Sequence, residues 1–400
     1  MALTGIASQK TPSVPVEIIT EPETGLPSAN QSVLIYGRAA STTAASSINS
    51  VYIVANSGDP VGVLAELNPI YGAGSELVKA VVAAINANAD VGNSNFPQLK
   101  VIALPYNQSD WGVSQISLSA ANNVQADFIT SPFDGSNVTL NGQLESHVAL
   151  VSGATRTENN QFGSFGVVVN QSVTNPNSLP LIDDKSLIGI WFRDTGAGAM
   201  ASTYSLAEHA AAAAALMASN AYPFNGLDNA VIGGELAPAQ QSDWISVGAA
   251  LESEAALNQG WTPIRVLANG DVAFVRTVTA RITNGAGSNV TAYYDVQDWQ
   301  VLYFWRKTVF TRSKQSDFQN VKASAEKATA LKGELIRLAK QFEVDGAFQQ
   351  VDNLAPQFVV QRNASDRNRF DVLTPVNVVP NLHVIAVRVA AGTQFDAFTV

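Results

Sequence analysis

The segment "GAGSELVKAVVAAINAN", residues 72–88, decides the fold class because it lies between runs that have the character of β-strands. "SVLIYGRA" (32–39) and "SVYIVANS" (50–57) precede it, and the apolar run "LKVIALPY" (99–106) follows it. Within the segment, apolar residues recur at helical spacing, and Ser75 stands where a helix N-cap belongs. Strands that alternate with a helix predict an α/β layer architecture.

Residues 107–185 have a different composition, rich in Asn, Ser, Gly and Thr. Short β-prone runs occur there, among them "HVALVSGA" (147–154) and "SFGVVVNQ" (164–171). We therefore predict surface β structure with long loops in this stretch, and a mixed fold class, α/β together with α+β, for the chain.

Two further helices are predicted in the middle of the chain. "SLAEHAAAAAALMASNA" (205–221) opens with a capping box of Ser205 and Glu208, and "SDWISVGAALESEAALNQ" (242–259) follows it. The alanine run of the first helix is shorter than the roughly 20 apolar residues of a membrane span and includes Glu208. Its small side chains favour close packing against a neighbour.

The last third of the chain begins with a hairpin signal, Asn269-Gly270 between two β-prone runs, and a domain boundary near residue 262 fits it. Helices are predicted from "VLYFWRKTVFTRSK" (301–314) and "SAEKATALKGELIRLAKQFEV" (324–344). The second has one apolar face at helical spacing. That face consists of Leu331, Leu335, Leu338 and Phe342.

Composition indicates an ordered protein without cysteine chemistry. Of its 400 residues 46% are hydrophobic and none is cysteine, so neither disulfides nor thiolate metal sites are available. The three histidines, His147, His209 and His383, are far apart in the sequence. We expect each to be a packed or surface residue, and we expect no metal site and no cofactor.

No catalytic motif stands out. "YGAGS" (71–75) lacks the third glycine of a nucleotide-binding loop, because Leu77 occupies that position, and it predicts a helix-entry turn instead. Asp183 and Asp184 could act as acid and base in a hydrolase, but carboxylates adjacent in sequence are usually solvated loop residues. We therefore expect no enzyme, and an adhesive surface protein stays open as the structural alternative.

Charge is distributed unevenly along the chain. The net charge of −10 argues against a general nucleic-acid binder. Residues 301–400 nevertheless contain 13 Lys and Arg against 9 Asp and Glu, whereas the first 300 residues contain 10 against 24. The C-terminal quarter should therefore have a different neighbour from the rest.

The densest charge cluster lies in "VQRNASDRNRFDVLTP", residues 360–375, although only 14% of the chain is charged. Its five charged residues are Arg362, Asp366, Arg367, Arg369 and Asp371. An active site, an acid-binding patch and a subunit contact are all compatible with such a cluster.

The C-terminal third resembles the contractile tail sheath proteins of Mu-like bacteriophages. The resemblance rests on "VQRNASDRNRFDVLTPVNVVPNLHVIAVRV" (360–389), preceded by "LKGELIRLAKQFEVDGAF" (331–348) and "NGDVAFVRTVTARI" (269–282). Near the N-terminus, "VPVEIIT" (14–20), followed by "SVLIYG" and "YGAGSELVKA", resembles the arm, first strand and helix-entry turn of that family. Residues 107–240 have no distinctive match.

The resemblance implies a multi-domain sheath fold, in which an inner α/β domain is built from both termini and an outer domain is inserted. Residues 1–27 and 381–400 would be arms lent as strands to adjacent subunits, 28–262 the outer domain and 263–380 the inner, tube-facing domain. Prolines on both sides of residues 14–20 fit a donated arm. The side chains expected in the exchanged strands are Val14, Val16, Ile18, Leu382, Val384, Ile385, Val387 and Val389.

The resemblance also implies a function. Such subunits polymerise helically around a tail tube, as stacked hexameric rings, and contract on a signal from the baseplate to drive the tube through the host envelope. The implied partners are other copies of the chain, the tail tube, the baseplate and the tail terminator, without direct contact to nucleic acid or insertion into a membrane. "MALTGIASQK" shows no signal peptide, so we expect assembly in the host cytoplasm and a final location in the virion tail.

Two hypotheses concern charged residues. The cluster at 360–375 would form ion pairs within and between inner domains, or alternatively a solvated, salt-bridged turn. Residues 306–340 contain nine basic against three acidic residues, and part of this segment would meet an acidic tube. The tube-facing candidates are Arg306, Lys307, Arg312 and Lys314.

Overall fold

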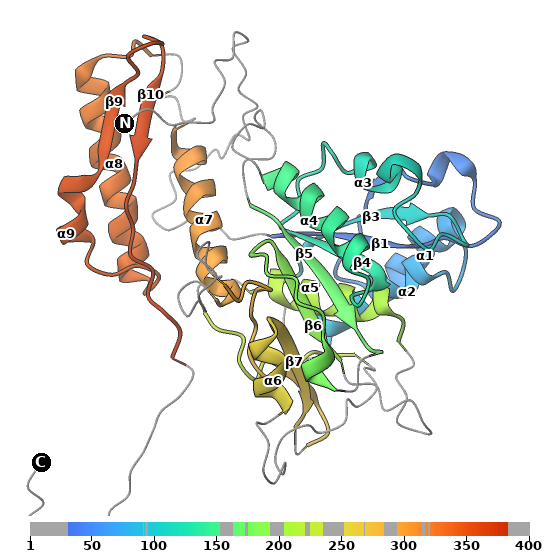
Figure 1. Ribbon diagram of the computed structural model, residues 1–400. Coiled ribbons are helices and arrows are strands. Elements are labelled where there is room, and N and C mark those ends of the chain that lie inside the picture. Colours follow the sequence, from blue (N-terminus) through green and yellow to red (C-terminus); the bar gives the residue numbers. More distant parts are fainter. Residues whose placement is uncertain are drawn as a thin grey trace, which may run out of the picture.

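The computed structural model describes residues 31–90, 92, 95–152, 163–172, 175–192, 204–220, 225–234, 252–267, 269–283, 294–313, 317–318 and 321–382. Over these residues the chain forms a sheet body, made of β1–β8 with α1–α6, and a C-terminal body, made of α8, α9, β9 and β10 (Figure 1). Helix α7 lies between the two bodies (Figure 1).

The sheet body contains one sheet with the order β2-β3-β1-β4-β5-β6-β7-β8 among the described strands. Neighbouring strands are parallel except at the two edges, where β2 and β8 run antiparallel to β3 and β7. The central strands are buried on both faces, which explains their continuous apolar runs. The strands are β1 Ser32–Arg38, β2 Val51–Ile53, β3 Gln98–Leu104, β4 Phe128–Asp134, β5 Phe165–Asn170, β6 Leu187–Trp191, β7 Trp261–Val266 and β8 Val272–Phe274.

Helices cover both faces of this sheet, as the strand–helix alternation predicts. Residues of α1, α2 and α5 form one apolar cluster with the sheet, and residues of α3, α4 and α6 form a second cluster. The helices are α1 Pro60–Tyr71, α2 Glu76–Ala89, α3 Ile116–Ala120, α4 Val138–Ser152, α5 Leu206–Ala218 and α6 Glu252–Asn258.

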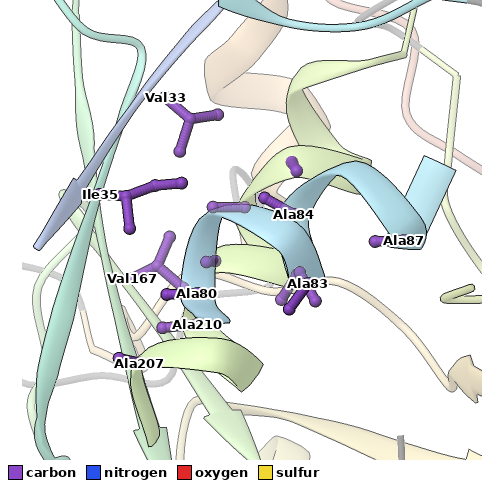
Figure 2. Packing of buried hydrophobic residues seen from close by; sticks show 14 of the residues in the cluster. Val33, Ile35, Ala80, Ala83, Ala84, Ala87, Val167, Ala207 and Ala210 are labelled. Atoms are coloured by element: carbon purple, nitrogen blue, oxygen red, sulfur yellow. The ribbon is translucent and has the colours of Figure 1, made fainter. Parts of the chain in front are cut away.

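Alanines allow α2 and α5 to pack closely on the sheet, which confirms the prediction for the alanine run. Figure 2 shows Ala80, Ala83 and Ala84 of α2 with Ala207 and Ala210 of α5 beside the strand valines. The predicted capping box opens α5, because Ser205 Oγ accepts from the Glu208 N–H and the Glu208 carboxylate accepts from the Ser205 N–H.

The prediction of surface β structure for residues 107–185 is wrong in two respects. "HVALVSGA" was expected to be β-prone, but its first six residues end helix α4. The apolar residues Leu140, Leu144, Val148 and Val151 recur at helical spacing and are buried, while Asn137 Oδ1 accepts from the Leu140 N–H at the helix start. "SFGVVVNQ" does form a strand, but β5 is buried in the middle of the sheet.

The hairpin predicted at Asn269-Gly270 is confirmed, since β7 pairs with β8 in antiparallel register across that turn. Both strands belong to the main sheet, so the boundary expected near residue 262 does not separate two cores. The sheet-body clusters extend to Val296, and a third cluster begins at Val301. The division therefore falls within α7, Val296–Ser313.

The C-terminal body contains α8 Ala325–Val344, α9 Val351–Leu354, β9 Val359–Arg362 and β10 Phe370–Leu373. The apolar face predicted for α8 is confirmed, because all four of its residues are buried in the third cluster. None of the described helices is long and apolar enough to cross a membrane.

Candidate assembly site

Strands β9 and β10 form a separate two-stranded antiparallel sheet. The pairing runs from Arg362↔Phe370 to Val359↔Leu373, and the Asn363 N–H donates to the Arg369 carbonyl at 2.9 Å. Because bonded and non-bonded pairs alternate in such a ladder, the backbone groups of Val360 and Val372 point outward. Within the described residues nothing pairs with either outer edge.

The hairpin is incompletely buried. β9 has two half-buried and two exposed residues, and β10 ends in Leu373, which is 48% exposed. Val344 at the end of α8 and Leu382 after the hairpin are 80% and 76% exposed. Two-stranded sheets are marginally stable alone, so a hairpin whose edges have no partner among the described residues, and which ends in a half-exposed leucine, indicates a surface that a partner covers.

Val360, Phe370 and Val372 of the hairpin pack against an aromatic cluster of α7 and α8. The rings of Trp305 and Phe342 meet edge to face with centroids 5.2 Å apart, and Phe342 stacks on Phe348 at 4.9 Å. Trp305 Nε1 donates to Thr374 Oγ1 at 3.1 Å. The hairpin is therefore held on one side by an aromatic core, while no strand of the described part of the chain pairs with its edges.

The turn between the strands is organised by Asn363. Its Oδ1 accepts from the Ser365 and Asp366 N–H groups, both at 2.8 Å, and its Nδ2 donates to Asp371 Oδ2 at 2.7 Å. The Asp366 carboxylate accepts from the Asn368 N–H at 2.9 Å. Asn363 was not among the predicted site residues, although asparagine before Ser and Asp is a recognised signal for such turns.

The structure separates the five charged residues of the cluster. Arg369 Nε donates to Asp371 Oδ1 at 2.9 Å, and Asp371 is buried. Arg362 is exposed and donates to the Ala323 carbonyl. Arg367 is exposed and has no hydrogen-bond or ion-pair partner among the described residues. The cluster is thus a salt-bridged turn that also presents two arginines.

Of the residues expected in exchanged strands, the structure describes Leu382. The others lie outside the described residues: Val14, Val16, Ile18, Val384, Ile385, Val387 and Val389.

The tube-facing candidates Arg306 and Arg312 make hydrogen bonds within the chain. Arg306 donates to the carbonyl of Ser152 at the end of α4, at 3.0 Å. Arg312 donates to Glu334 on α8 at 2.7 Å, and the bonds from Arg337, with this bond from Arg312, lower the pKa of Glu334. Lys307 is half-buried beside Asp127, and Lys314 lies outside the described residues.

Two features of the sheet body, a cleft and a buried histidine, contain polar side chains. A cleft of about 500 Å³ lies at the carboxyl ends of β1 and β4, but its cation Arg38 pairs with Glu76 at 2.9 Å. Burial lowers the pKa of His209 to about 3, and its ring stacks on Phe192. Among the described residues no group of three or more His, Asp or Glu could hold a metal ion.

Comparison with solved structures decides the fold. A chain of the anti-feeding prophage baseplate matches with a TM-score of 0.62 at 10% identity, over 96% of this chain and 100% of that chain. The chain has the contractile sheath fold. The sheath tail protein of Listeria innocua matches at 0.59 and 12% identity, over 90% and 93% of the two chains. The contracted helical sheath of the anti-feeding prophage matches at 0.58 and 12%, over 96% and 99%.

The resemblance seen in the sequence is thus confirmed for the sheath fold, while the Mu-like type stays a prediction. No family model and no curated protein matches the chain.

Proposed function

We propose that this chain is the structural subunit of a contractile sheath, which polymerises helically around a tube and contracts on a signal from the baseplate. The observation that carries the proposal is the match to sheath structures over nearly the whole chain, including a sheath in the contracted state. Contraction then requires no cofactor, since subunits of a metastable lattice move to a packing of lower energy.

The two bodies suggest the domain roles. The sheet body would be the outer domain and the C-terminal body, with the two arms, the inner domain that faces the tube. The arms would be residues 1–27 and 381–400. This assignment moves the inner boundary from residue 262 into α7, where the apolar clusters divide.

The open hairpin supports strand exchange between subunits. No described strand pairs with either of its edges, and the chain has two candidate arms, so a neighbour's strand on each edge would complete a four-stranded sheet. "NLHVIAVRV" (381–389) could form about four or five hydrogen bonds on each side, each contributing about 0.5–1.5 kcal/mol. Head-to-tail exchange of this kind generates an open helical lattice.

The partners follow from this arrangement. They are further copies of the chain, arranged in sixfold rings like the sixfold-symmetrised baseplate match, together with a tube, a baseplate and a tail terminator. For the tube contact we retain Lys307 and Lys314 as the candidates to test, because reversing Arg306 or Arg312 would also remove their bonds to Ser152 and Glu334. The sheath would assemble in the host cytoplasm and act in the tail.

Negative-stain microscopy of the purified full-length protein tests the proposal. Long tubes of regular diameter and helical repeat are expected. A protein that stays monomeric at every concentration and salt condition, with and without a tube protein, would contradict it.

A further inference from the structure

The turn of the β9–β10 hairpin is built from its own side chains. Asn363 and Asp366 bond the turn backbone, and Asn363 and Arg369 both bond the carboxylate of Asp371. These bonds fix the loop without any second molecule. Arg362 and Arg367 stay on the outside of it.

Because the turn is fixed by its own hydrogen bonds, Arg367 is preorganised for binding. Its backbone is already ordered, so binding loses less conformational freedom than it would from a mobile loop. The guanidinium presents a planar set of donors that fits a carboxylate with two parallel hydrogen bonds. The expected ligand is therefore a carboxylate, and the question is which molecule supplies it.

The N-terminal arm has the matching charge. Residues 11–37 contain Glu17, Glu21 and Glu23 and no Lys or Arg. The other candidate arm is different, because residues 376–395 contain Arg388 and neither Asp nor Glu. A turn that carries two exposed arginines would attract the first arm and repel the second.

We propose that Arg367, assisted by Arg362, binds the glutamates at positions 17–23 of a second copy of this chain. This inference rests on the proposed strand exchange and deepens it. The pairing selects which arm adds beside the turn and sets its register, since a wrong arm or a shifted strand leaves the arginines without a carboxylate. The contact discriminates between arms, and the backbone ladder supplies most of the attraction.

The first test is direct binding to the full-length chain. A fluorescent peptide of residues 11–27 is titrated by polarisation against the wild type, Arg367→Glu and Arg362→Glu/Arg367→Glu. We expect at least about tenfold weaker binding to the variants in 0.1 M salt, and a loss of this difference in 1 M salt. Arg337→Glu is the matched control, because Arg337 is an exposed arginine of the same body that pairs with Glu334.

The second test reverses the charges on both sides. A peptide with Glu17→Lys, Glu21→Lys and Glu23→Lys should bind the double variant better than the wild type. Equal binding of the native peptide to all variants, or no recovery with the reversed peptide, would overturn the inference. Failure of the proposed function is distinguishable, because it appears as absent tubes in the wild type while the peptide measurement still gives a result.

Discussion

The ring of Tyr303 on α7 lies directly against the backbone of Gly163, just before β5. A Cβ atom at residue 163 would overlap the ring, which also packs on Phe165 with centroids 5.1 Å apart. Nearby, Lys185 lies over the ring of Trp299 at 4.7 Å. Helix α7 thus packs on the sheet body through its first half and on the C-terminal body through its second half.

Gly163→Ala should weaken the packing of α7 on the sheet body. The added methyl group forces the Tyr303 ring to move, and overpacking of this kind costs about 1–3 kcal/mol. Urea denaturation of the variant measures the change in the free energy of unfolding. Gly142→Ala is the control, since that glycine lies in α4 with open space around it, and alanine there should stabilise the helix by about 0.5–1 kcal/mol. Equal stability of both variants would show that the contact between Tyr303 and Gly163 does not stabilise the packing of α7 on the sheet body.

His209 should make the sheet body sensitive to acid. Burial lowers its pKa from 6.5 to about 3, so the unfolded chain binds a proton at a pH where the folded chain does not. Stability from this residue is complete above about pH 6.5 and falls as the pH drops toward 3, by about 2 kcal/mol at pH 5.

Urea denaturation of the wild type and of His209→Phe at pH 7.5 and pH 5 measures this effect. The variant should lose less stability between the two pH values than the wild type does. The same loss in both proteins would show that His209 is not the group responsible.

Asn363 should control the order of the hairpin turn. Asn363→Ala removes two acceptor bonds to backbone N–H groups and the bond to Asp371, at a cost of about 1–3 kcal/mol. Hydrogen exchange at residues 359–373 should become faster, with the sheet body unchanged. Asn368→Ala, at an exposed position of the same turn, should leave exchange as it is. Unchanged protection in the Asn363 variant would refute this role.

Lys307 and Lys314 should affect assembly on the tube. Reversing both to glutamate should lower the yield of sheath around an acidic tube at low salt, and the difference should shrink at high salt, because surface charges are screened. Lys79→Glu, at an exposed position of α2 in the sheet body, serves as the control. Co-sedimentation with the tube measures the yield, and unchanged sheath at both salt concentrations would eliminate these residues.

Most of the fold was predicted from patterns of residues that are close in sequence. The cap at Ser75, the capping box at Ser205, the Asn269-Gly270 hairpin and the apolar face of α8 each depend on residues close in sequence, and the structure has all of them. Helix α4 was missed because its β-prone end "HVALVS" outweighed the helical spacing of its leucines and valines.

Long-range contacts could not be predicted in the same way. Strand order places β7 and β8 in the main sheet, and the Arg306 bond to Ser152 joins residues far apart in sequence. A charged residue in a sequence also does not reveal whether its partner lies in its own chain. Arg369 and Asp371 pair with each other, whereas Arg367 stays exposed.

Deletion of residues 381–400 tests the central claim, donation of the C-terminal strand to a neighbour, most directly. Sedimentation and circular dichroism of the truncated protein would be compared with the full-length chain, and the same measurements made after deletion of residues 1–20. The account predicts folded monomers with native helix content and no tubes, since each strand completes a sheet in another subunit. Tubes of normal length and diameter from either truncated protein would contradict it.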